Sequence, residues 1–243
     1  MRPLLLLLLA LICAEPGRAS VFVRFETPLG SFDVELYDDA APGTVENFLH
    51  YVETGRYVNS FVHRSAALPG VFVIQGGGFT YDAQLGPFVF GQGLRSVPSF
   101  APIASEYELS NTRGTIAMAL SGSPEADPHS GTSQWFINVN DNSAALNPQQ
   151  FTVFGSVVEP GMEVVDDAFA LQRWDAHLIR LALASIPLIG FVQNTPIGPQ
   201  HLVYTNVTEV PEPGEFALRA GALACVLLLA RLTARRRAAA PRS

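Results

Sequence analysis

Arg64 is the residue whose setting first suggests chemistry. It follows His63 in residues 61–79, FVHRSAALPGVFVIQGGGF, where most other side chains are apolar or glycine, and Gln75 comes eleven positions later. A guanidinium keeps its proton and presents its donors in a fixed plane, so between two apolar strands it can hydrogen-bond a substrate. Taken alone, Arg64 is better explained by a structural ion pair with one of the many acidic residues.

Other chemistries lack their residue patterns. The histidines form no i, i+4 pair and have no acidic partner at ligand spacing, so no metal site is expected. Residues 131–135, GTSQW, do not match the Gly-x-Ser-x-Gly elbow of a serine nucleophile. The glycines at 76–78 are not followed by Lys-Ser/Thr, so they indicate tight backbone packing and not a phosphate cradle.

The charge distribution argues against nucleic acid as a partner. All fifteen basic residues are arginine, and between Ser20 and Val210 seven arginines stand against nineteen acidic residues, a formal charge of −12. Binding to a phosphate backbone needs a clustered cationic face. An acidic, solvated surface is the expected result.

The first nineteen residues have the composition of a secretory signal. Residues 1–19 combine one early arginine, an apolar run and small residues, with a cleavage site expected after Ala19. The only cysteines are Cys13 and Cys225, so the middle of the chain has none and forms no disulfide. We expect an exported protein, in the periplasm or at the cell surface.

The C-terminal residues 210–243 read as a separate tail. VPEPG opens the tail at 210–214, a short apolar segment covers 216–232, and an arginine cluster stands at 235–237. A full membrane span needs about 20 apolar residues, so this one is short, but Arg219 can extend toward the membrane surface. A buried terminal helix fits the closing RRRAAAPRS less well, and we expect a membrane anchor.

Local periodicity supplies the elements that must position Arg64. Alternating apolar residues predict strands over 21–25 and 32–36, joined by a turn at 27–30. A helical stripe follows, and Gly55 lies where that helix should stop. The stripe consists of Val45, Phe48, Leu49 and Val52.

Short strands recur along the rest of the chain, at 71–75, 115–120, 135–139, 151–158 and 201–209. A second helical stripe contains Met162, Val165 and Phe169. Residues 178–199 are apolar but broken by prolines and glycines, and no element is assigned to them. Many short strands with two helices predict a mainly β, closed antiparallel barrel capped by the helices.

Five segments in order, YVNSFVHR, VFVIQGGGF, PIASEYELSNTRGTIAMAL, SGTSQWFINV and LNPQQFTVFGSVVEPGMEVVD, resemble a cyclophilin-type peptidyl-prolyl cis-trans isomerase. The resemblance spans about residues 21–170 and implies a cyclophilin-like domain over 20–209. It also implies the family's closed eight-stranded antiparallel barrel with two helices. The implied activity is cis–trans isomerisation of X-Pro bonds in proline-containing peptides and unfolded exported proteins, without metal or cofactor.

By the same resemblance, Arg64 is the catalytic residue, because it follows a histidine as the family's arginine does. The implied substrate-binding residues are Phe72, Val73, Gln75, Ala119, Gln134, Phe136, Leu146 and Phe151.

The chain departs from the family pattern near this site. Residues 66–68 look like a three-residue insertion, and Ala145 stands where many members have tryptophan or phenylalanine. Phe151 replaces a histidine common in the family, and Leu120 replaces a frequent asparagine. A proline-peptide binding module or chaperone with little turnover is the alternative function, and a purely structural surface protein is a third.

The tail resembles a PEP-CTERM sorting signal of Gram-negative bacteria, because Val-Pro-Glu-Pro-Gly, an apolar segment and an arginine cluster occur in that order. This resemblance implies cleavage near residues 211–213 by an exosortase-like enzyme.

Overall fold

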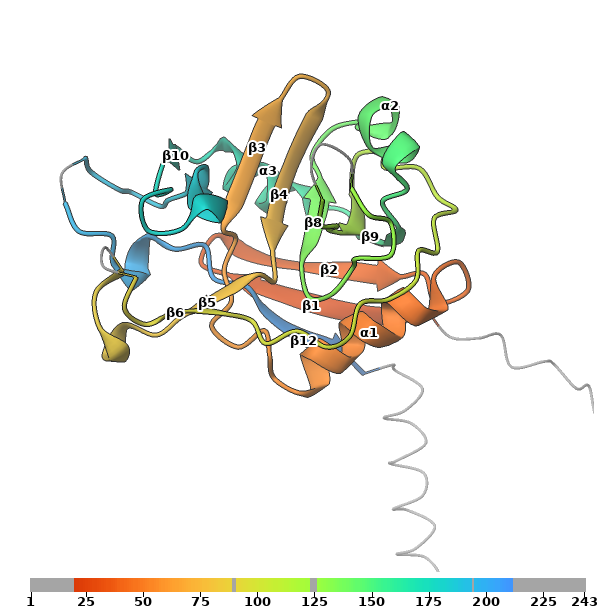
Figure 1. The fold of residues 1–243 in the computed structure, drawn as a ribbon, viewed down its shortest axis with the longest axis horizontal. Helices are drawn as coiled ribbons and strands as arrows, with labels where there is room; N and C mark the ends of the chain where they lie inside the picture. The colour runs from red at the N-terminus through yellow and green to blue at the C-terminus, as the bar shows by residue number, and fades with distance from the viewer. Residues whose placement is uncertain (1–19, 89–90, 123–125, 194, 212–243) are drawn as a thin grey trace, which may run out of the picture.

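The computed structural model describes residues 20–211 except 89–90, 123–125 and 194 (Figure 1). The predicted signal peptide at 1–19 and nearly all of the predicted tail lie outside the described residues. Within the described part, no helix is long and apolar enough to cross a membrane.

The N-terminal hairpin forms as predicted. β1 (Val21–Thr27) and β2 (Gly30–Leu36) pair antiparallel, with Val23 opposite Val34 and Phe25 opposite Phe32. All four of these side chains are buried, because alternate residues of a strand point to the same face. The alternating pattern therefore marked the core face of both strands correctly.

The first predicted helix is α1 (Pro42–Glu53), which buries Val45, Phe48 and Tyr51. Its start is capped from a distant loop. The carboxylate of Glu106 accepts hydrogen bonds from the backbone N–H groups of Gly43 and Thr44 at 2.9 and 2.7 Å. Such groups have no partner within a helix, and a negative charge there also suits the helix dipole.

The main sheet has eight antiparallel strands in the order β12-β1-β2-β9-β7-β8-β4-β3. Every strand predicted from the sequence is present, although the last one starts at Asn206 and not at 201. Residue 201 ends a 3-10 turn, η5 (Pro199–His201), and Leu202 and Tyr204 form isolated bridges to Leu188 and Phe61. The remaining strands of this sheet are β3 (Arg64–Leu68), β4 (Val71–Gly76), β7 (Thr115–Met118), β8 (Trp135–Asn138), β9 (Val153–Val157) and β12 (Asn206–Val210).

The sheet curls into a half-barrel, and the predicted closure is wrong. Its end strands, β12 and β3, are not paired with each other. Only the residues preceding them meet, through Val62 N–H to Val203 O at 2.9 Å and Thr205 N–H to Ser60 O at 2.8 Å. Further along, the edge of β3 is taken by another segment, since Ser65 N–H donates to Ser185 O at 2.8 Å. That contact occupies a position that closure would require.

The helices lie on the sheet as expected. α1 packs against β12, and α3 (Met162–Ala170) packs against β2 and β4. A single helical turn, α2 (Ser143–Leu146), continues into η3 (Asn147–Gln149).

Residues 178–199, unassigned from the sequence, belong to a second apolar cluster beside the main core. They contribute η4 (Leu181–Leu183) and β11 (Ile186–Pro187), and β11 pairs with β10 (Arg173–Trp174). The cluster also includes residues of β5 (Phe79–Tyr81) and β6 (Leu94–Ser96), which are joined through η1 (Ala83–Leu85). Its fully buried members include Phe61, Phe88, Leu183, Ile186 and Leu202.

Candidate active site

The β3–β4 hairpin places Arg64 directly opposite Gln75. Residues paired across antiparallel strands point to the same face, and the Arg64 Nη1 group donates to Gln75 Oε1 at 3.1 Å. Residues 66–68 continue the same register to the tip of the hairpin, where Leu68 pairs with Val71. The turn at the tip contains Gly70, whose φ of +77° suits glycine.

The hydrogen bonds continue from Gln75 into the protein. Gln75 Nε2 donates to Gln134 Oε1 at 2.9 Å, and Gln134 and the imidazole of His63 lie together against Gly78. Gly78 makes room for this arrangement. A methyl group there would lie 2.9 Å from His63 Cε1 and 3.0 Å from Gln134 Cδ. The four polar side chains therefore form one chain of contacts that ends at the Arg64 guanidinium.

Burial controls the charge of His63. Desolvation first, and the neighbouring Arg64 cation second, lower the pKa of His63 from 6.5 to about 3. The imidazole is therefore neutral near neutral pH. Partial burial also lowers the pKa of Arg64, but an arginine in a protein keeps its proton. Arg64 is thus the cation of the network.

The glycine run at 76–78 serves backbone packing. A methyl group on Gly76 would lie 2.4 Å from the ring of Trp135, and Gly77 has φ of +72° with Ser133 O close by. These close approaches require glycine. They agree with the interpretation of this run as a tightly packed strand end.

A pocket of about 150 Å³ opens beside the Arg64–Gln75 pair. Polar groups occupy one side of it, and aliphatic and aromatic side chains form the rest. Phe136 and Phe151 meet edge to face in this wall, with ring centroids 5.5 Å apart. The lining residues are Arg64, Val71, Val73, Gln75, Ala119, Leu120, Phe136, Leu146 and Phe151.

Most of the predicted site residues therefore converge on one pocket. Gln134 lies behind it, in contact with Gln75. Phe72 also lies outside the lining, because neighbouring residues of a strand point to opposite faces. Since Val73 faces the pocket, Phe72 packs on the other side of β4, with its ring 6.4 Å from that of Phe169. Phe72 therefore lies outside the lining of this pocket, and its predicted role in substrate binding stays a prediction.

Two lining residues were not among the predicted ones. Val71 precedes Val73 by two positions, so the alternation of β4 was the signal that would have identified it. Leu120 follows Ala119 at the end of β7 and also reaches the pocket.

Hydrogen bonds from residues 173–185 fix the outer edge of β3 at Ser65, the residue after Arg64. Ser65 is fully buried, and each of its polar groups bonds to residues 173–185. Its N–H donates to Ser185 O, and Arg173 Nε donates to Ser65 O and Oγ at 3.1 and 3.0 Å. The Ser185 hydroxyl also donates to Ser65 O. This clamp, formed by Arg173 and Ser185, satisfies an edge that would otherwise be open.

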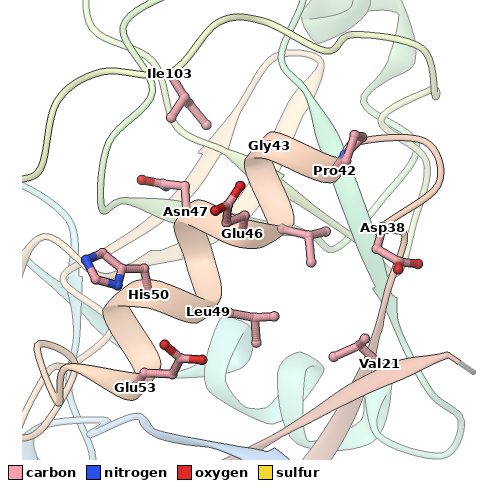
Figure 2. A pocket seen from close by; sticks show the side chains of 11 residues that line it. Val21, Asp38, Pro42, Gly43, Glu46, Asn47, Leu49, His50, Glu53 and Ile103 are labelled. Carbon is pink, nitrogen blue, oxygen red and sulfur yellow. The ribbon is translucent and has the colours of Figure 1, made fainter.

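A larger hollow, of about 760 Å³, runs along α1 (Figure 2). Asp38, Glu46 and Glu53 border it together with His50. Among the described residues, no group of three or more histidine, cysteine or acidic side chains is arranged to hold a metal ion. Of these two, the smaller pocket is the stronger candidate site, because Arg64 faces an apolar wall there, whereas acidic side chains border the hollow along α1.

Residues 22–176 match the family model described as "Cyclophilin type peptidyl-prolyl cis-trans isomerase/CLD". The chain belongs to this family. The second, C-terminal apolar cluster extends beyond the matched residues, since Leu183, Ile186 and Leu202 follow position 176.

Named relatives agree with the family and with its activity. A peptidyl-prolyl cis-trans isomerase of Acinetobacter baylyi is 32% identical over 205 residues, covering 82% of this chain and 92% of that protein. Peptidyl-prolyl cis-trans isomerase B of Escherichia coli is 40% identical over 152 residues, covering 59% of this chain and 81% of the relative. The cyclophilin domain is therefore a peptidyl-prolyl cis-trans isomerase.

Solved structures agree with the fold. A cyclophilin-type isomerase from Cryptosporidium parvum aligns with a TM-score of 0.55 at 22% identity, over 80% of this chain and 100% of the other. At this identity, the similarity supports the fold alone.

Proposed function

We propose that the isomerase domain binds the proline ring of an X-Pro segment in the pocket beside Arg64, and that the Arg64 guanidinium accelerates rotation about the X-Pro bond. The observation that carries this proposal is the Arg64–Gln75 hydrogen bond of 3.1 Å at the wall of an apolar pocket. A C. parvum cyclophilin solved in the presence of the dipeptide Ala-Pro supports the choice of ligand.

The reaction needs a donor and no covalent chemistry. Amide resonance imposes a barrier of about 18–20 kcal/mol, and rotation breaks that resonance without breaking a bond. In the twisted transition state the proline nitrogen regains its lone pair. A hydrogen bond from Arg64 to that nitrogen forms only there, so it lowers the barrier without tightening substrate binding equally.

The surrounding residues orient the Arg64 guanidinium and exclude water from the pocket. Val73, Phe136 and Leu146 form the apolar wall for the proline ring. Gln75 holds one Arg64 nitrogen and is itself held by Gln134, so the guanidinium is oriented before substrate arrives. A donor oriented in advance needs little reorganisation during the reaction.

The test is an isomerisation assay with proline peptides on the full-length protein and on Arg64→Ala. We expect kcat/KM to fall about 100-fold or more, because one oriented donor in such a site is worth about 3 kcal/mol. Arg95→Ala removes an arginine whose Nη1 bonds only the neighbouring Leu94 carbonyl in the described contacts, and should keep full activity. Peptide binding without acceleration in any form would favour the binding module or chaperone. A lack of peptide binding would favour a structural surface protein.

For the ends of the chain, we propose export by residues 1–19 and transient membrane anchoring by 216–232, with processing near 211–213 by an exosortase-like enzyme. The support is the sequence pattern described above. The substrates would then be unfolded exported proteins. Mass spectrometry of the exported protein should find a C-terminus near Pro213, and an intact Arg237 would contradict cleavage.

A further inference from the structure

The apolar wall of the pocket continues along the β3–β4 hairpin to its tip. Ala66 pairs with Val73 at the level of the pocket, and Leu68 pairs with Val71 one level further out. Paired residues of antiparallel strands point to the same face, so these four side chains form one apolar strip. Ala66 and Val73 are buried, whereas Leu68 is 52% exposed. The strip thus begins in the pocket and ends on an uncovered leucine.

The tip of the hairpin lies beside α2, at the rim of the same pocket. A methyl group on Gly70 would lie 3.7 Å from the Cβ atom of Ala145. Leu146, the next residue of α2, lines the pocket together with Val71. The small Ala145 side chain therefore allows the hairpin tip to stand close to α2, and the outer strip remains continuous with the pocket.

We propose that Leu68 and Val71 form an apolar subsite, which receives a leucine-sized side chain within two residues of the substrate proline. The inference rests on the proposed function, since it takes the proline ring to occupy the pocket beside Arg64. Its geometric basis is the strand repeat. Same-face residues of an extended chain are about 6.6–6.8 Å apart, which is the spacing of the two levels on the hairpin. An extended peptide has the same repeat, so its neighbouring side chains can reach Leu68.

The chemistry of the strip defines the preferred substrate. All four of its side chains are apolar, so an aliphatic residue gains by leaving water there, and a charged residue loses hydration without a partner. This predicts a preference for unfolded segments in which a large aliphatic residue lies near proline.

The test compares alanine peptides containing one proline with peptides that carry leucine at each of the two positions before and after it. Exchange spectroscopy by NMR measures isomerisation by the full-length protein. We expect leucine at one or more positions to raise kcat/KM about 5-fold, below the 10- to 200-fold of a closed pocket because the subsite is open. Leu68→Asn should abolish the gain and leave the all-alanine rate unchanged.

Leu85→Asn is the matched control, because Leu85 is 55% exposed and lies on η1, outside the strip. It should preserve the gain. The subsite is overturned if leucine raises kcat/KM at no position, or if it raises kcat/KM equally in Leu68→Asn. In either case, activity on the all-alanine peptide still upholds the proposed function. Light scattering provides a further check. If Leu68→Asn keeps the gain from leucine but changes the protein from a dimer to a monomer, Leu68 is a contact between copies of the chain. That result also overturns the subsite. Inactivity toward every peptide overturns both proposals.

Discussion

Arg64 and Gln75 stand opposite each other on β3 and β4, and the guanidinium donates to the side-chain oxygen across the strand pair at 3.1 Å. Both strands extend by equal amounts beyond this pair, so the regular register continues to Leu68 and Val71 at the tip of the hairpin. The same pair connects the pocket to the Gln134–His63 contacts behind it.

Gln75→Glu should retain the fold and lose activity. A carboxylate at this position would bind the Arg64 guanidinium as an ion pair and compete with the substrate for its donors. We expect kcat/KM to fall about 10-fold or more. The free energy of unfolding should fall by about 1–3 kcal/mol, because the glutamate loses the donor to Gln134 Oε1. Gln84→Glu makes the same change at an exposed position and should preserve the rate. Unchanged catalysis in Gln75→Glu would argue against a role for the free guanidinium donors.

Gly78→Ala should disturb the support of the site. Its new methyl group would press on His63 and Gln134 at 2.9–3.0 Å, so the Gln134 side chain must move away from Gln75. We expect a loss of about 1–3 kcal/mol in the free energy of unfolding, as for overpacked cores, together with reduced kcat/KM. Gly190→Ala is the comparison. A methyl group there meets nothing within 4 Å, but φ is +55°, so this variant should lower the free energy of unfolding and leave kcat/KM unchanged. If kcat/KM were the same in the two variants, the proposal that Gly78 supports the site through His63 and Gln134 would be wrong.

His63 should make the protein sensitive to acid. Its pKa is about 3 in the folded protein and near 6.5 when unfolded, so the unfolded state binds more protons between these values. The contribution of neutral His63 to the free energy of unfolding is therefore complete above pH 6.5 and is lost as the pH falls toward 3. Between pH 7 and 5 this amounts to about 2 kcal/mol in the free energy of unfolding.

Urea unfolding at several pH values measures this effect. His63→Gln should show a shallower pH dependence than the unaltered protein, whatever its stability at pH 7. His177→Gln removes an exposed histidine and should keep the steep dependence, because His63 is still present. Parallel curves for the unaltered protein and His63→Gln would refute the assignment.

The clamp on β3 should matter for both stability and rate. Arg173→Met removes the donors to Ser65 and to the Phe169 carbonyl, leaving buried acceptors with fewer partners. We expect the free energy of unfolding to fall by about 1–3 kcal/mol. We also expect kcat/KM to fall about 3- to 10-fold, because Arg64 is the next residue on the strand and catalysis is sensitive to small displacements.

Arg180→Met provides the comparison for the clamp. Arg180 lies in the same C-terminal segment, over the ring of Phe79 at 5.7 Å, and makes no described contact to β3. Arg173→Lys should recover part of the loss, because it restores a donor and a charge. If the two methionine variants have equal rates, β3 does not need the clamp to position Arg64.

The sequence by itself determined the elements whose signal is local. Alternation located β1 and β2, and the stripe through Val45 and Phe48 located α1, because burial follows the period of the chain wherever one face meets the core. It also determined the candidate site. A cation and several amides between apolar strands, in the order typical of cyclophilins, pointed to Arg64, Gln75 and the aromatic wall.

Only the tertiary structure decided which side of a strand faces the pocket and how the sheet ends. The face of β4 depends on its register with β3 and β8, which puts Val71 and Val73 in the pocket and Phe72 behind it. Sheet closure depends on long-range competition for the edge of β3, where Ser185 bonds Ser65. Residues 178–199 gave no periodic signal, because prolines and glycines interrupt them, and their order comes from packing against β5, β6 and the β3 edge. Such contacts join residues far apart in the sequence, 120 positions for Ser65 and Ser185, and no local pattern records them.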